Sequence, residues 1–118
     1  MADITQINQK RFFTLSDARG LLPVVKRITE QAYNQVQLLS TQLSYIPDPK
    51  KRAEVEERVR TTFQDWYDKI RKLGCESKGL WLVDFDTGEG YYCWHHPEEE
   101  IEYFHGYFQG YQGRVKIH

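Results

Sequence analysis

The amino-acid sequence predicts an α+β domain in which a long antiparallel helical hairpin is followed by a small C-terminal antiparallel β-sheet. Between residues 23 and 73, apolar residues recur every three or four positions, as they do on one face of a helix. A short loop with two prolines, residues 45–49, divides this stretch in two. After residue 79, apolar residues occur instead in short runs separated by glycine and proline, which is typical of strands and turns.

The first helix is expected to begin after Thr14. The Thr14 hydroxyl can accept a hydrogen bond from a free backbone N–H, and Asp17 follows near the positive end of the helix dipole. Pro23 has no backbone N–H, so we expect a kink in the helix or a restart at this residue. The helix should then continue to about Ser44. Its apolar stripe consists of Val25, Ile28, Ala32, Val36, Leu39 and Leu43.

The second helix is expected to begin at Asp48 and Pro49, because aspartate caps helix N-termini and proline suits the first helical position. It should continue to about Leu73 and end at Gly74, which can adopt the left-handed conformation of a C-terminal cap. Its apolar stripe consists of Val55, Val59, Phe63, Trp66, Ile70 and Leu73. Two long helices joined by a short loop run antiparallel.

The C-terminal part is predicted to form a three-stranded meander. The expected strands are residues 80–85, 91–95 and 101–105. A glycine-containing hairpin loop should join the first two, and a turn at Pro97 the last two. The glycines after residue 105 predict a flexible, aromatic tail.

The length of 118 residues predicts a single domain, residues 1–118. Its expected parts are a loose N-terminal arm at 1–11, the helical hairpin at 14–74, and the meander with its glycine-rich tail at 79–118. No apolar run approaches the ~18 residues of a membrane span, and the N-terminus lacks the apolar stretch of a secretory signal. The two cysteines, Cys75 and Cys93, form no disulfide framework, so we expect a cytoplasmic protein with free thiols.

The sheet is expected to be too short to cover the whole hairpin. A helix of ~23 residues is ~35 Å long, whereas a strand of ~6 residues spans ~20 Å. The far end of the hairpin would then expose a group of apolar side chains. These are Leu39, Leu43, Ile46 and Val55. Because a four-helix bundle with coiled-coil-like packing would bury them, the sequence predicts a structural or interaction module that forms a homodimer through its helices.

Residues 76–118 contain ten of the seventeen aromatic residues, with eight acidic and three basic side chains. Stacking of nucleic-acid bases on such aromatics also requires a basic groove, so a nucleic-acid partner is not expected. An aromatic core or interface is the better interpretation. The acidic charge leaves two alternatives open: it serves solubility, or it attracts a cation or a basic partner.

Three residues of this segment are candidate metal ligands: Cys93, His95 and His105. If the second and third strands pair antiparallel about Pro97, residue 93 lies opposite residue 103, and positions 93, 95, 103 and 105 can share one face. Thiolate and imidazole groups suit a divalent Zn or Fe ion. The alternative is a buried cysteine beside partly exposed histidines, because the sequence contains no CxxC or HExxH motif.

A wider small-ligand site on the sheet, with or without enzymatic activity, is the second functional hypothesis. Asp84 interrupts an apolar strand, so its carboxylate must be paired, hydrogen-bonded or exposed. We expect an ion pair with Arg114, and capture of an anion by Arg114 is the alternative. The acidic residues 98–100 and Glu102 suit either acid–base roles or a solvated loop. The candidate ligand or metal residues are Asp84, Cys93, Glu98, Glu100, His105 and Arg114.

Short motifs from Arg11 onward are similar to those of a known family. They are Arg11-Phe12-Phe13-Thr14-Leu15, Ala18, Leu22-Pro23, Gly79, Val83-Asp84-Phe85, Cys93-Trp94, Glu98, Glu100-Ile101, His105 and Gly110-Tyr111-Gln112-Gly113-Arg114. With them the chain resembles a family of small prokaryotic proteins of unknown function, domain of unknown function 2203. Pro97 and Asp86 stand where the family usually has glycine and proline. The resemblance implies no activity, but it singles out Asp84, Cys93, Trp94, Glu98, His105 and Arg114.

Overall fold

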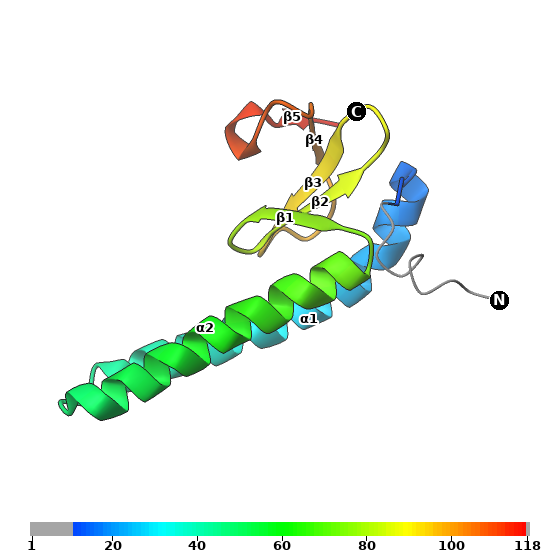
Figure 1. Cartoon of the computed structure of the whole chain (residues 1–118). Coiled ribbons are helices and arrows are strands. Elements are labelled where there is room, and N and C mark those ends of the chain that lie inside the picture. The colour runs from blue at the N-terminus through cyan, green and yellow to red at the C-terminus, as the bar shows by residue number, and fades with distance from the viewer. Residues whose placement is uncertain (1–10, 118) are drawn as a thin grey trace.

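A computed structural model describes residues 11–117 and confirms the predicted α+β architecture (Figure 1). Two helices, α1 (Leu15–Leu43) and α2 (Pro49–Lys72), form the hairpin. Five antiparallel strands follow, each beside the next: β1 (Glu76–Gly79), β2 (Leu82–Asp86), β3 (Tyr91–His95), β4 (Tyr103–His105) and β5 (Val115–Lys116). Before β5 lies a short 3-10 helix, η2 (Tyr111–Gly113). The sheet lies over one end of the hairpin, and the expected arm at 1–11 falls, except for Arg11, outside the described residues.

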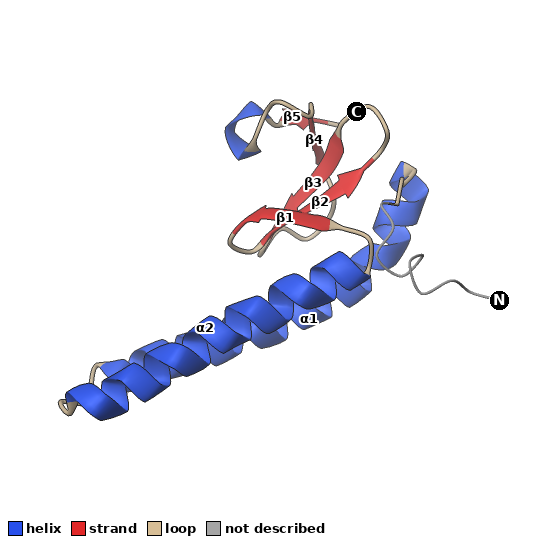
Figure 2. Ribbon diagram, in the orientation of Figure 1, coloured by secondary structure: helices blue, strands red, loops and turns tan. Residues whose placement is uncertain are grey.

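The start of α1 is capped as predicted. The Thr14 hydroxyl accepts a hydrogen bond from the Asp17 backbone N–H (3.0 Å), and the Asp17 carboxylate accepts one from the Thr14 N–H (3.1 Å). Pro23 lies inside one continuous helix, so the helix does not restart there. The first turns of α1 nevertheless run in a different direction from the rest of the helix (Figure 2). A proline ring inside a helix clashes with the carbonyl group four residues earlier, which accounts for the bend.

The start and end of α2 also agree with the prediction. The Asp48 side chain accepts a hydrogen bond from the Lys50 N–H (3.2 Å), and Pro49 occupies the first position. The chain leaves the helix through Gly74, whose φ of 86° is left-handed. Arg52 closes the loop between the helices by donating hydrogen bonds to the carbonyl oxygens of Leu43 and Ile46.

The two helices cover each other's apolar stripes over their full length. Leu39 and Val55 are buried within the hairpin of a single chain, and Leu43 and Ile46 are half-buried. The expectation that the far end of the hairpin leaves Leu39 and Val55 uncovered is therefore wrong, because α2 covers α1 where the sheet does not. The homodimer itself stays a prediction, and sedimentation at micromolar concentration tests it.

Trp81 attaches the sheet to the hairpin. Its ring centroid lies 5.1 Å from that of Trp66, 5.5 Å from Phe63 and 5.7 Å from Tyr33. Its φ of 61° makes Leu80 and Trp81 a turn, so the strand predicted from residue 80 begins only at Leu82. A left-handed conformation costs an L-residue ~1–2 kcal/mol. Burying a large aromatic side chain stabilises the fold by at least that amount.

Two short strands at the edges of the sheet were not predicted. β1 has the polar sequence Glu-Ser-Lys-Gly, and β5 consists of only two residues within the expected flexible tail. Such strands carry little β propensity of their own and form because β2 and β4 offer them backbone hydrogen bonds. The glycine-rich tail is thereby attached to the sheet.

β2 is buried on both faces, and the two faces differ in chemistry. Val83 and Phe85 belong to the hydrophobic core shared with the helices, together with Trp94 on β3. Asp84 and Asp86 alternate with them and point to the opposite face, yet each is only 1% exposed. The sheet therefore has an apolar layer on the helix side and a buried polar layer on the other. None of the helices in residues 11–117 is long and apolar enough to cross a membrane.

Trp94→Ala should destabilise the domain by ~3–5 kcal/mol, because a fully buried aromatic residue leaves a cavity when truncated. This is a large part of the ~5–15 kcal/mol that stabilises a domain. Tyr45→Ala is the matched control, since its side chain is 81% exposed. Urea unfolding followed by circular dichroism measures both; equal effects of the two substitutions would contradict the placement of Trp94 in the core.

Candidate metal centre

The strand register brings three of the predicted site residues together. Cys93 on β3 pairs with Asp84 on β2 and with Tyr103 on β4, which is the register predicted around the Pro97 turn. His105 pairs with Tyr91, one pleat further along the same face. The side chains of Asp84, Cys93 and His105 therefore meet on the polar face of the sheet.

Asp84, Cys93 and His105 form a compact and fully buried group. Each is at most 1% exposed. One possible ligand atom from each residue, a carboxylate oxygen, the sulfur and an imidazole nitrogen, lies within 4.8 Å of the other two. Within residues 11–117, this is the group whose geometry could hold a metal ion.

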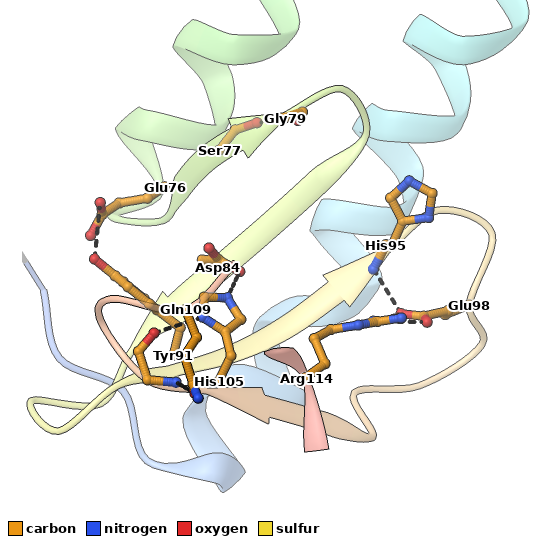
Figure 3. A network of polar contacts seen from close by, with 11 residues as sticks. Glu76, Ser77, Gly79, Asp84, Tyr91, His95, Glu98, His105, Gln109 and Arg114 are labelled. Carbon is orange, nitrogen blue, oxygen red and sulfur yellow. Dashed lines mark hydrogen bonds and ion pairs between the residues drawn. The ribbon is translucent and has the colours of Figure 1, made fainter. Parts of the chain in front are cut away.

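The hydrogen bonds of His105 determine where its protons lie. Nδ1 lies 2.9 Å from the carbonyl oxygen of Gly106, and Nε2 lies 3.1 Å from Oδ1 of Asp84 (Figure 3). A carbonyl oxygen only accepts, so Nδ1 carries a proton. In a neutral imidazole, Nε2 would then present a lone pair to a carboxylate oxygen, which is repulsive. This arrangement favours a proton or a metal ion between Nε2 and Oδ1.

The other donors of the group are equally suited to a cation. Oδ2 of Asp84 is buried and, among the described residues, has no hydrogen-bond partner. The pKa of the Cys93 thiol is raised, first by burial and then by the neighbouring Asp84 carboxylate, while the Arg114 guanidinium opposes this shift. The thiol is therefore protonated near neutral pH unless a metal ion displaces its proton.

Asp86 extends the buried polar layer. Its Oδ1 accepts hydrogen bonds from the Tyr107 hydroxyl (2.6 Å) and from the Gly88 backbone N–H (2.9 Å). The Tyr107 ring packs edge-on against Tyr91, with 5.1 Å between the centroids. We did not predict Asp86, Tyr91 or Tyr107 as site residues. The spacing of two between Asp84 and Asp86 on one strand was the available signal.

Arg114 does not pair with Asp84, and this prediction is wrong. Its guanidinium forms an ion pair with Glu98 (2.9 Å) and lies between the rings of Tyr103 and Tyr111, 4.1 Å from each centroid. Asp84 already has His105 as its partner. Figure 3 shows these as two separate pairs. Capture of an external anion by Arg114 is not favoured, because the Glu98 carboxylate already neutralises the positive charge of the guanidinium.

The other candidates lie outside the group of three. The backbone N–H of His95 donates to Glu98 (2.8 Å), and its ring packs against Tyr111. Glu98 therefore forms an ion pair with Arg114 and a hydrogen bond with the backbone of β3, and no hydrogen bond or ion pair joins it to the buried group. Glu100 is exposed. Cys75 is buried in the hydrophobic core, where burial raises the pKa of its thiol to about 12.

Comparison with protein families agrees with this description. The model of the family described as "Uncharacterized conserved protein (DUF2203)" matches residues 11–117. The chain belongs to the DUF2203 family. Its match covers the hairpin, the sheet and all three residues of the buried group, so the predicted resemblance is confirmed. Searches of curated proteins and of solved structures gave no match.

His105→Ala should destabilise the protein by ~3–5 kcal/mol, because it leaves the Asp84 carboxylate buried without its partner. The double substitution Asp84→Ala/His105→Ala should lower the free energy of unfolding by clearly less than the sum of the two single substitutions, because it removes both partners of the pair together. The control is Glu99→Ala, which breaks the exposed pair with Lys26 and should cost at most ~1 kcal/mol. Chemical denaturation measures all four variants, and strict additivity would show that the pair does not interact.

Proposed function

We propose that this DUF2203 protein binds one divalent metal ion, with Zn²⁺ as the favoured ion, through Asp84, Cys93 and His105. The observation that carries the proposal is the orientation of His105. A histidine that binds a metal through Nε2 commonly donates its Nδ1 proton to a backbone carbonyl or carboxylate, and His105 donates to the Gly106 carbonyl oxygen.

The donor types favour zinc over calcium or magnesium. Calcium and magnesium prefer oxygen ligands, whereas zinc accepts sulfur, nitrogen and carboxylate oxygen together. Zinc–ligand distances of ~2.0–2.3 Å place the atoms of a tetrahedral site ~3.5 Å apart. The atoms here lie within 4.8 Å of one another, so side-chain movements of about an ångström would suffice. Three protein ligands leave a fourth position for water or a small ligand.

The charges of the site are consistent with this role. A zinc ion would displace the proton between Asp84 and His105 and the proton of the Cys93 thiol. It would also supply a partner for Oδ2 of Asp84, which has none among the described residues. The opposing interpretation is a proton shared by a structural Asp84–His105 pair, with Cys93 as a buried neighbour.

Metal binding can be tested with protein purified without a histidine tag. We expect about one equivalent of zinc by elemental analysis, and a thiolate-to-metal charge-transfer absorption when Co²⁺ is added to metal-free protein. Cys93→Ser should abolish this absorption while keeping the fold, because serine is nearly equal in volume to cysteine. His105→Gln should weaken metal binding strongly.

Each substitution has a control in the same chain. Cys75→Ser changes the other buried cysteine, which lies in the hydrophobic core, and His95→Gln changes a histidine of the same strand as Cys93. Both should retain the metal and the absorption. The shared-proton interpretation would be correct if wild-type protein took up no more Zn²⁺ or Co²⁺ than Cys93→Ser.

A further inference from the structure

Residues 106–114, which we call the C-terminal arch, lie against the polar layer of the sheet. The helices pack on the opposite face, through Val83, Phe85 and Trp94. The buried group must therefore be covered by another part of the chain. The contacts of the arch identify it as a cover: Tyr107 donates a hydrogen bond to Asp86, and Tyr111 packs on His95. The Arg114 guanidinium is near enough to Cys93 to oppose the rise in the pKa of its thiol that burial causes.

The first end of the arch is attached to the metal centre itself. His105 is one of the three proposed ligands, and its ring donates a hydrogen bond to the carbonyl oxygen of the next residue, Gly106. Tyr107 adds the hydrogen bond to Asp86. This end cannot move far without disturbing the ligands.

The second end is held by Arg114, the one charged side chain of the arch, and is followed directly by β5, which pairs with β4. Its guanidinium is stacked between Tyr103 of β4 and Tyr111 of the arch and is paired with Glu98. Its side chain is 10% exposed, so these contacts are largely shielded from water. Between the two ends the arch contains Gly106, Gly110 and Gly113, and Phe108 is fully exposed.

We propose that Arg114 is a latch that controls access to the buried Asp84–Cys93–His105 group, and that the arch opens from its Arg114 end. The inference rests on the proposed function for the identity of the ligand, a metal ion. The opening itself does not depend on that function. The side chain of Cys93 reports it directly, because a fully buried thiol reacts with an added reagent only when its cover moves away.

The experiment compares rates of thiol modification in the folded, metal-free protein. Cys93 and Cys75 are both buried, but Cys75 lies in the core between the helices and the sheet and is not covered by the arch. A maleimide reagent and mass spectrometry of peptides give the two rates separately. In Arg114→Ala, Cys93 should react about tenfold faster or more, since two cation–π contacts and a shielded ion pair no longer close the arch. The Cys75 rate should not change.

Two further variants sharpen this result. Glu98→Gln removes the partner of Arg114 and should also accelerate modification of Cys93. Lys116→Ala is the matched control, because Lys116 is a basic residue of β5, two positions after Arg114, whose only described ion pair, with Glu102, is long and exposed. It should leave the Cys93 rate at the wild-type value. An unchanged rate of Cys93 modification in Arg114→Ala would refute the latch. Equal acceleration of the modification of Cys93 and Cys75 would also refute it, because that result indicates a general loosening of the fold.

Addition of Zn²⁺ separates this inference from the proposed function. If both are correct, Zn²⁺ protects Cys93 in the wild type, and zinc transfer to a chelator is about tenfold faster from Arg114→Ala than from Lys116→Ala. If zinc gives no protection but Arg114→Ala still exposes Cys93 selectively, the latch stands and the proposed metal function fails. If zinc protects Cys93, but metal-free Arg114→Ala shows no faster modification of Cys93 and zinc transfer is equally fast from both variants, Arg114 is not the latch.

Discussion

The burial of two carboxylates on β2 is the constraint on which the C-terminal third of the protein depends. Asp84 and Asp86 are both 1% exposed on the face of the sheet that the helices do not cover. A buried carboxylate without partners costs several kcal/mol of folding free energy, so the fold must supply a donor or a cation for each. His105 is the hydrogen-bond partner of Asp84. Asp86 accepts hydrogen bonds from the Tyr107 hydroxyl and the Gly88 N–H. The arch that follows β4 is therefore held to the sheet by polar contacts rather than by an apolar core.

This arrangement links the proposed site to the stability of the sheet. An apolar residue at position 84 would pack on the sheet without requiring any partner, and buried ion pairs are often no more stabilising than apolar residues of similar size. A carboxylate, a thiol and an imidazole whose second nitrogen is already hydrogen-bonded are, in contrast, donor types that zinc accepts. This contrast supports the proposed metal site, since stability alone does not require a buried polar layer here.

The sequence predicted the elements whose signals are local. The caps at Thr14 and Asp48, the left-handed Gly74 and the two apolar stripes depend on neighbouring residues, and the structure has them all. The pairing of Cys93 with residue 103 followed from the proline turn. The Trp81 turn could not be predicted, because a left-handed tryptophan is stabilised only by its contacts with the distant helices.

Partners of charged side chains were the least predictable feature. Arg114 was expected to pair with Asp84, but both have nearer partners that depend on the path of the arch. Likewise, Leu39 and Val55 were expected to be uncovered because the sheet is short. The second helix covers them, and the length of the sheet carried no information about this contact.

We predict a positive charge between Nε2 of His105 and Oδ1 of Asp84, with the Nδ1 proton donated to the carbonyl oxygen of Gly106. Long-range proton–nitrogen NMR correlation of the imidazole groups tests this most directly. In metal-free protein, Nδ1 of His105 should be protonated, and added Zn²⁺ should change the resonance of Nε2 to that of a metal-bound nitrogen while Nδ1 keeps its proton. An Nδ1 without a proton, or a His105 spectrum unaffected by Zn²⁺, would contradict the account.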